Sequence, residues 1–364
     1  MVKRSFLLLK LTLGVTLLAG LSISTPGTAA GSSFFAGKTM RVVAGFSPGG
    51  SIDLRSRLFA RYLPRYIPGH PKAIVQNITG AGGIIAANYT YAVAKGDGLT
   101  ILHFPSSTIM NTFLRAGKVQ YDIRKMPIIW VQSDSWVAVF NPKTSKVKTV
   151  ADLSRTPVVL AAGGSGVTSL RSLRPKVALV LLGVKHKWVT GYRGSAGLMA
   201  AMDRGEIHVS EHPLAAYNAL IKPREENGTA AILWQTGNLQ PNGSFKRSPL
   251  LPNVPTLAEI LPKEKKKGRV WEAWKAAVAP QTFQSSVALP PNVPADRLAI
   301  LSKAFEAMTR DKAYQRDFQK TLNQPANALI GDDAARVVKD GLKRLFEGYK
   351  EGIEYLKNLP KRSR

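Results

Sequence analysis

The chain contains no cysteine and only five histidines among its 364 residues. The absence of cysteine excludes disulfide frameworks, thiolate zinc sites, iron–sulfur clusters, cysteine nucleophiles and lipid attachment through cysteine. Five histidines also argue against a multi-histidine metal centre. Acidic residues are scarce as well, because 23 Asp and Glu stand against 51 Lys and Arg, and the formal net charge is +28.

Long apolar runs are absent after residue 30, whereas a membrane-spanning helix needs about 20 apolar residues. Residues 1–30 form a short basic start, a mostly apolar stretch at 6–21 and a small-residue end at Ala30. This pattern predicts a signal peptide that is cleaved after Ala30, and therefore a periplasmic protein. The alternative is an N-terminal membrane anchor, but the apolar stretch is short for one and contains Lys10.

Export decides how the positive charge is interpreted. A cytoplasmic protein this basic would suggest nucleic acid as a partner, but an exported protein does not meet it. Three interpretations of the positive charge remain: it attracts anionic solutes, it binds an anionic membrane surface, or it only keeps the surface solvated. The basic run at 263–269 is interpreted as a solvated loop.

Strand-like and helix-like patterns alternate along a chain whose length suggests about two domains. Three strand–turn–helix units come first, with strands at 39–44, 73–75 and 99–104 and turns at 46–50, 79–83 and 105–107. Such units predict a parallel sheet with right-handed crossovers. The three turns should then meet at the carboxyl edge of the sheet, where open α/β folds bind ligands.

A second set of elements begins past Trp136, and it predicts a second α/β lobe. The first lobe is assigned to residues 31–134 plus 236–364, and the second lobe to 135–235. Further predicted strands lie at 158–161, 207–209, 230–234 and 270–279, and residues 294–356 should be mostly helical.

Glycine-rich turns open two of the expected helices, at 47–51 and 80–83. Glycine lets the backbone approach a ligand, and the unpaired N–H groups of a helix start attract anions. The alternative is that these glycines only make tight turns. Both interpretations stay open on the residues alone.

Two segments resemble a nucleotide-binding motif and an enzyme motif, but each lacks one required residue. Residues 80–85 begin like a dinucleotide fingerprint, but Ile85 occupies the place of its third glycine. Residues 163–167 miss the hydrolase elbow, because Val167 replaces its last glycine. The sequence therefore predicts neither a nucleotide site nor a hydrolase, and it implies no cofactor.

Two histidines and two glutamates lie close together at His208, His212, Glu206 and Glu211. A four-residue spacing aligns metal ligands on a helix, whereas this segment has the pattern of a strand. No metal site is predicted, and the role of these histidines stays open.

The order of several short motifs resembles the tripartite tricarboxylate transporter receptor family, the Bug-type periplasmic solute receptors. Residues 41–53 are similar to the family's first strand and its P-G-G-(S/T)-x-D turn. Further similar segments follow in order at 80–83, 97–102, 192–196, 205–207 and 254–259, and the resemblance covers roughly 35–352. The chain departs from the pattern at 78–79, at 279–282 and at Glu211, where the family has Asp.

The resemblance implies an α/β, two-lobed periplasmic binding protein of type II, a Venus-flytrap with parallel-rich sheets flanked by helices. It implies a small carboxylate as ligand, membrane permease subunits of a tripartite tricarboxylate-type transporter as partners, no metal and no catalysis. We expect a monomer. A sensor that feeds a signalling partner is one alternative, and an enzyme that uses Glu211, His212 or His103 as a base is another.

The family's ligand residues, carried over by motif, fall on both lobes. The first lobe would contribute Phe46, Ser47, Pro48, Gly49, Gly50, Ser51, Asp53, Gly80, Ala81, Gly82, Gly83, Ser106 and Ser107. The second lobe would contribute Ser165, Thr168, Tyr192, Gly194, Ser195 and Glu211. Asp53 lies in the first turn of a helix, so that its role is either ligand contact or interaction with the helix start.

Overall fold

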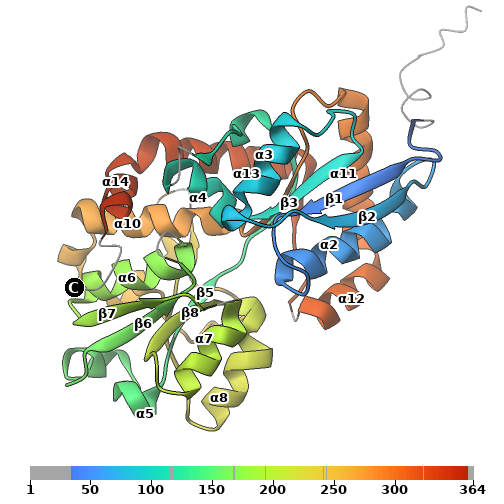
Figure 1. Cartoon of the computed structure of the whole chain (residues 1–364). Coiled ribbons are helices and arrows are strands. Elements are labelled where there is room, and N and C mark those ends of the chain that lie inside the picture. The colour runs from blue at the N-terminus through green and yellow to red at the C-terminus, as the bar shows by residue number, and fades with distance from the viewer. Residues whose placement is uncertain are drawn as a thin grey trace, which may run out of the picture.

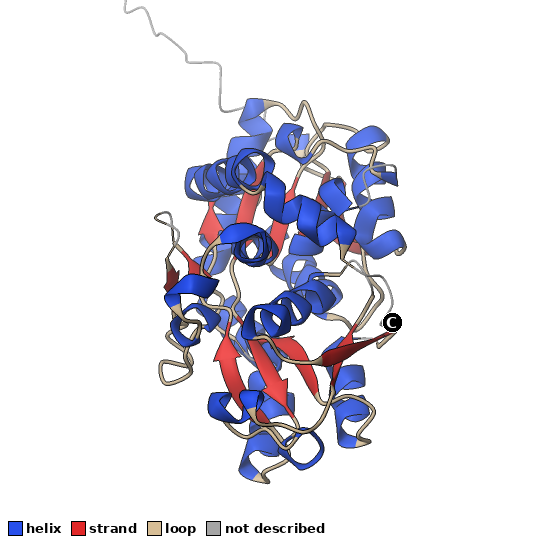
Figure 2. Cartoon of the chain, turned by 90° about the vertical axis from the view of Figure 1, so that its left-hand side faces the viewer, coloured by secondary structure: helices blue, strands red, loops and turns tan. Residues whose placement is uncertain are grey.

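The computed structural model describes residues 34–359 except 115–117, 167–168, 193, 241, 243 and 323. The expected signal peptide at 1–30 lies outside these residues. The described chain forms two lobes, each built on one sheet with helices packed against it (Figures 1 and 2). Among the helices described, none combines the length and the apolar character that a membrane crossing requires.

The first sheet has the strand order β13-β4-β12-β3-β1-β2. β1 pairs in parallel with both β2 and β3, which confirms the parallel arrangement of the first three units, whereas β12 is antiparallel to β3 and β4. Its strands are β1 (Thr39–Ala44), β2 (Lys72–Asn77), β3 (Thr100–Pro105), β4 (Ile128–Gln132), β12 (Ser285–Ala288) and β13 (Leu329–Ile330).

The second sheet has the order β7-β6-β8-β5-β9 and is formed entirely between Trp136 and Gln235. β6 is parallel to β7 and β8, and β5 is antiparallel to β8 and β9. Its strands are β5 (Trp136–Phe140), β6 (Leu160–Gly164), β7 (His186–Thr190), β8 (Val209–Pro213) and β9 (Ala231–Gln235); a small ribbon joins β10 (Asn238–Leu239) and β11 (Phe245–Lys246).

The helices lie mainly between the strands and after β11. They are α2 (Ser51–Tyr62), α3 (Ile84–Ala92), α4 (Ser106–Leu114), α5 (Pro142–Ser145), α6 (Leu170–Leu182), α7 (Gly194–Asp203), α8 (Lys222–Glu226), α9 (Leu257–Ile260), α10 (Gly268–Val278), α11 (Ala295–Arg310), α12 (Lys312–Leu322), α13 (Gly331–Lys343) and α14 (Lys350–Asn358). The helical character expected for 294–356 is confirmed.

The strand predicted at 270–279 is wrong, because this segment is helix α10. Trp271, Trp274 and Val278 recur at helical spacing and are buried, whereas Glu272 and Lys275 on the other side form an ion pair. An apolar stretch of this length fits a strand or a helix equally well in sequence. The packing of α10 between α6 and α14 stabilises the helix.

The first sheet has a hydrophobic cluster on each of its two faces, and neighbouring side chains of a strand can belong to different clusters. In β1, Met40 and Val42 face a cluster with Phe59 of α2, whereas Val43 faces the opposite cluster with Ile84 of α3. This two-residue period is what a sheet covered on both faces requires.

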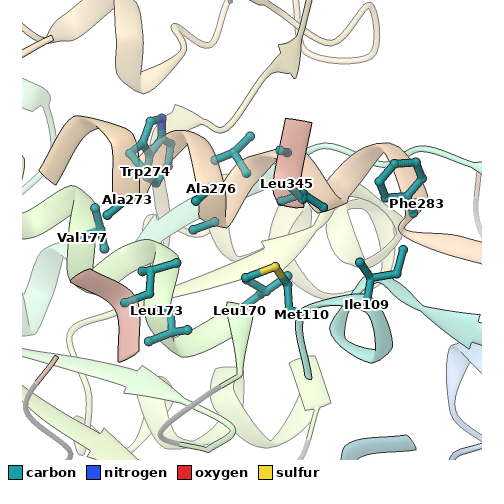
Figure 3. Close-up of a cluster of buried hydrophobic side chains, with 14 of the residues drawn as sticks. Ile109, Met110, Leu170, Leu173, Val177, Ala273, Trp274, Ala276, Phe283 and Leu345 are labelled. Atoms are coloured by element: carbon teal, nitrogen blue, oxygen red, sulfur yellow. The ribbon is translucent and has the colours of Figure 1, made fainter. Parts of the chain in front are cut away.

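One hydrophobic cluster continues from the first lobe into the second. Figure 3 shows Met110 of α4 beside Leu170 of α6, with Trp274 of α10 across from Val177. The lobes are therefore in contact through α4, α6 and α10, and this contact brings the start of α6 close to α4.

Candidate functional site

Three predicted turns meet at one edge of the first sheet. Since β1, β2 and β3 are adjacent and parallel, the segments that follow them lie side by side. α2 begins at Ser51, α3 at Ile84 and α4 at Ser106, each directly after its turn. Neither α2 nor α3 has a side-chain cap, so that their first N–H groups are available to an anion.

Asp53 holds the first turn in place. Its carboxylate accepts hydrogen bonds from the Gly49 N–H at 2.9 Å, from Asn77 Nδ2 at 2.9 Å and from Arg57 Nε at 2.9 Å. Burial alone would raise the pKa of Asp53, but the bonds from Arg57, Gly49 and Asn77 outweigh it and lower that pKa. Because the buried carboxylate is occupied by these donors, Asp53 orients the exposed residues 47–51.

The second turn has four successive residues with positive φ, namely Gly80 (130°), Ala81 (49°), Gly82 (68°) and Gly83 (91°). L-residues with side chains rarely adopt this backbone. A Cβ added at Gly83 would also lie 3.1 Å from Thr108 Oγ1 and 3.2 Å from the ring of Phe46. The glycines are therefore required by conformation and by space, and the first turn, the second turn and helix α4 come together here.

Asn111 fixes the second turn from α4. Its Nδ2 donates a hydrogen bond of 3.1 Å to the carbonyl of Gly82. The hydroxyl of Thr108, on the same helix, is buried without a partner among the described residues. Asn111 and Thr108 were not predicted from the sequence, because no short motif marks them.

The third turn connects the two lobes. Ser106 Oγ donates to Gln284 Oε1 at 3.1 Å, and Trp136 Nε1 donates to the same oxygen at 3.2 Å. Ser107 follows at the start of α4 and is partly exposed. Gln284 and Trp136 are separated by 148 residues, so that local pattern could not have found this contact.

The second lobe places two of its predicted turns after parallel strands. Ser165 follows β6, and Gly194 and Ser195 begin α7 after β7. Ser195 Oγ accepts a hydrogen bond of 3.1 Å from Arg171 Nη1. Thr168 lies outside the described residues.

Tyr192 lies beside the carboxyl end of β6, and Glu211 does not follow its strand. The N–H of Tyr192 donates to the carbonyl of Gly164 at 3.4 Å, and its hydroxyl donates to Glu206 at 3.0 Å. Glu211 was expected after the strand that begins near Ile207, but β8 runs on to Pro213 and contains it. Glu211 is fully buried, and its Oε2 accepts from Arg174 Nε at 2.9 Å. Its assignment to the end of the strand is therefore wrong.

The Arg174–Glu211 pair is shielded from solvent on both sides, since both side chains are 0% exposed. Burial raises the pKa of Glu211 and lowers that of Arg174, and the charge of each partner opposes these shifts. The pair thus needs both members, because either charge left alone in this position would be strongly destabilising.

The histidines considered as bases or metal ligands are hydrogen-bonded to other groups of the protein. His103 is buried, with Nδ1 2.8 Å from Ser56 Oγ and Nε2 2.7 Å from Ser285 Oγ. His212 is also buried, and burial holds the pKa of both rings well below the usual value. His208 Nδ1 accepts a hydrogen bond from the Ala161 N–H. Within the described ranges, no group of three His, Asp or Glu side chains is placed to hold a metal ion.

Three surface grooves lie away from the turns. They are formed by α10 with α14, by the chain before β4 with α13, and by β4 and β13 with α11. None of these three grooves includes a predicted ligand residue. The candidate site therefore rests on the convergence of the turns and helix starts.

Comparison with known proteins gives results consistent with this geometry. A family model described as "Tripartite tricarboxylate transporter family receptor" matches residues 69–345. The protein BugT of Bordetella pertussis is 27% identical over 270 residues, which cover 72% of this chain and 77% of that protein.

Two solved structures share the fold. The periplasmic binding protein BugD superposes with a TM-score of 0.60 at 17% identity, covering 88% of this chain and 97% of that one. Rpa4515 of R. palustris with adipate superposes with a TM-score of 0.62 at 20% identity, covering 88% and 97%. The fold is thus that of a two-lobed periplasmic binding protein.

Proposed function

This chain belongs to the tripartite tricarboxylate transporter receptor family, and on that basis we propose that it is a periplasmic receptor for a small carboxylate. The ligand binds between the lobes, which close on it, and the receptor delivers it to the membrane subunits of a tripartite tricarboxylate-type transporter. We assign residues 135–235 to one lobe and the flanking segments to the other. The observation that carries the proposal is the convergence of three turns with two uncapped helix starts at one sheet edge.

Hydrogen bonds from these turns are sufficient for micromolar binding of a carboxylate. A micromolar ligand requires about −8 kcal/mol. Each hydrogen bond to a charged group contributes about 1.5–3 kcal/mol. Five or six such bonds from backbone N–H groups and serine hydroxyls reach this value after the losses of association. The related structure with adipate supports a carboxylate as the ligand class.

We propose no catalytic role for the side chains considered as general bases, and their burial supports this. The three side chains considered as general bases, His103, Glu211 and His212, are all fully buried. A general base must reach the proton that it removes, and buried side chains that are bonded within the core do not reach a bound ligand.

The first test of the proposed function is a thermal-shift series. The chain from Gly31 onward is mixed with mono-, di- and tricarboxylates, with neutral sugars and with organic cations as controls. A carboxylate at 100 times its Kd should stabilise the protein by about 2.7 kcal/mol. If only sugars or cations raise the melting temperature, the ligand class is wrong.

Export gives a second expected result. We expect the mature chain to begin near Gly31 and to fractionate with the periplasmic proteins, because residues 1–30 have the pattern of a signal peptide. Intact-mass measurement of the exported protein checks this. Recovery of the uncleaved chain in the membrane fraction would contradict it.

Asp53→Ala should weaken binding through the first turn. Without the carboxylate, the Gly49 N–H and Asn77 lose their acceptor, and the turn loses its fixed orientation. We expect a loss of about 1–2 kcal/mol of binding free energy, a factor of about 5–30, measured by calorimetry with the most stabilising acid of the thermal-shift series.

The matched control for Asp53 is Asp152→Ala. Asp152 also accepts hydrogen bonds from backbone N–H groups, those of Lys148 and Thr149, but it lies before β6 in the second lobe and outside the predicted turns. Its variant should bind as the wild type does. Equal binding by both variants would show that Asp53 has no part in ordering the site.

A further inference from the structure

Two arginines of α6 stack on one tryptophan at the boundary of the lobes. The guanidinium carbon of Arg174 lies 4.1 Å from the centre of the Trp136 ring, and that of Arg171 lies 4.7 Å from it. Trp136 is the first residue of β5, directly after the chain enters the second lobe. Two guanidinium groups therefore lie against this ring at the boundary of the lobes.

The two arginines differ in their partners. Arg174 is paired with Glu211 inside the lobe. Arg171 is partly exposed, and its Nη1 donates to Ser195 Oγ and to the main-chain carbonyl of Glu211, at 3.1 and 3.2 Å. In the part of the chain that the structure describes, Arg171 forms no salt bridge with a carboxylate.

The charges around Trp136 do not balance. Asp134, between β4 and β5, interacts with Arg55 and Arg174. Burial raises the pKa of Asp134 to about 7, so that it is not a full counter-charge near neutral pH. Beside the Trp136 ring, Arg171 and Arg174 share one carboxylate, that of Glu211, which leaves one positive charge. Burial, and then repulsion by Arg174, lower the pKa of Arg171 to about 10, against the opposing effect of Glu211. A bound anion would relieve this cost.

Arg171 is also close to the first-lobe turns. The Trp136 ring on which it stacks is bonded through Gln284 to Ser106, in two hydrogen bonds of 3.2 and 3.1 Å. On its other side, Arg171 is bonded to Ser195 at the start of α7. The guanidinium therefore lies between predicted ligand residues of both lobes.

We propose that Arg171 binds a second anionic group of the ligand, and that this receptor selects dicarboxylates over monocarboxylates. The inference rests on the proposed carboxylate receptor and names its ligand class. The first-lobe turns hold one carboxylate through backbone N–H groups, and the Arg171 guanidinium holds the other. Arg174 stays with Glu211 and positions Arg171 through Trp136.

The test is calorimetry with two matched ligand series. The dicarboxylates from succinate to adipate are compared with monocarboxylates of the same length, butyrate to hexanoate. For the wild type, the best dicarboxylate should bind about 10- to 100-fold more tightly than its monocarboxylate, the range for hydrogen bonds to a charged group. In Arg171→Gln this preference should fall to about threefold or less, with monocarboxylate binding retained.

Two further variants complete the experiment. Arg155→Gln removes an exposed charge from the second lobe and should keep the preference, which controls for net charge. Arg171→Lys keeps the positive charge but loses the planar guanidinium group, and it should show an intermediate preference. If Arg171→Gln does not fold, Arg171→Lys takes its place in the experiment.

The outcomes separate the two proposals. If both series bind alike in the wild type, or if Arg171→Gln keeps the full preference, the dicarboxylate assignment is overturned and the carboxylate receptor stands. If no member of either series binds, and none of the acids in the thermal-shift series stabilises the protein, both are overturned.

Discussion

Gly82→Val should abolish high-affinity carboxylate binding in a chain that still folds. Gly82 has φ +68°, a conformation that costs an L-residue roughly 1–2 kcal/mol and is a genuine outlier for a β-branched one. The turn would relieve the strain by changing its backbone. This change would break the Asn111 bond to the Gly82 carbonyl and would redirect the N–H groups at the start of α3.

The expected size follows from the hydrogen bonds that are lost. Two bonds to a charged carboxylate at about 1.5–3 kcal/mol each amount to about 3–6 kcal/mol, which is a loss of affinity of roughly 10²- to 10⁴-fold. Calorimetry with the most stabilising carboxylate measures it. Circular dichroism first establishes that the variant is folded.

Gly228→Val is the matched control for Gly82→Val. Gly228 has φ +71°, and a Cβ added there would meet no atom within 4 Å, so that its backbone strain is comparable. It lies in the loop between α8 and β9 of the second lobe, outside the predicted turns. Tight binding by folded Gly82→Val, equal to that of Gly228→Val, would mean that the second turn is only structural.

Arg174→Leu should cause a large loss of stability, because it leaves the carboxylate of Glu211 buried without its partner. Removing one member of a buried pair costs about 3–5 kcal/mol. Urea denaturation should therefore show a fall of this size in the free energy of unfolding. By contrast, Arg310→Leu, which removes the exposed partner of Glu306, should change that free energy little.

The loss in Arg174→Leu should depend on pH. Burial already raises the pKa of Glu211, and the variant removes the arginine that opposes the shift. A carboxyl group whose pKa is raised on folding contributes stability below its unfolded value of about 4.3, and this contribution is lost as the pH rises through the folded value. The deficit should therefore be smaller at pH 5 than at pH 8.

Arg174→Leu/Glu211→Leu tests the cause directly. With both charges removed, the buried site holds apolar side chains, and such replacements are often neutral or stabilising. The double variant should regain most of the lost stability and should lose the pH dependence. A deficit in Arg174→Leu that is equal at pH 5 and pH 8 would mean that lost packing on Trp136, and not an unpaired Glu211, is responsible.

The sequence by itself determined the early architecture of this protein. The strand-like segment at 39–44 and the four-residue spacing of Leu54, Leu58 and Tyr62 predict β1 and α2, and the structure has both elements there. The buried face of α2 was predicted only in part, because Leu54 is only partly buried whereas Arg55 is buried. The glycines at 80–83 likewise predict a turn, because glycine adopts positive φ without a steric cost.

Elements with an ambiguous local pattern were decided by packing. The sequence of α10 is compatible with a strand or a helix, and the burial of Trp271 and Trp274 in the core favours the helix. β8 begins and ends later than its apolar residues suggest, since Glu211 and His212 are polar side chains inside a buried strand. A buried charge has no local signature, because its partner is distant in sequence.

Only the tertiary structure decided which distant side chains are in contact around the candidate site and how their charges are paired. Arg174 meets Glu211 across 37 residues, Trp136 meets Gln284 across 148, and Ser106 meets Gln284 across 178. Composition shows an excess of 28 positive charges but not the position at which Arg171 and Arg174 share one carboxylate, that of Glu211. That position depends on which side chains the two sheets bring within a few ångströms, and electrostatic interaction decays with this distance and not with separation along the chain.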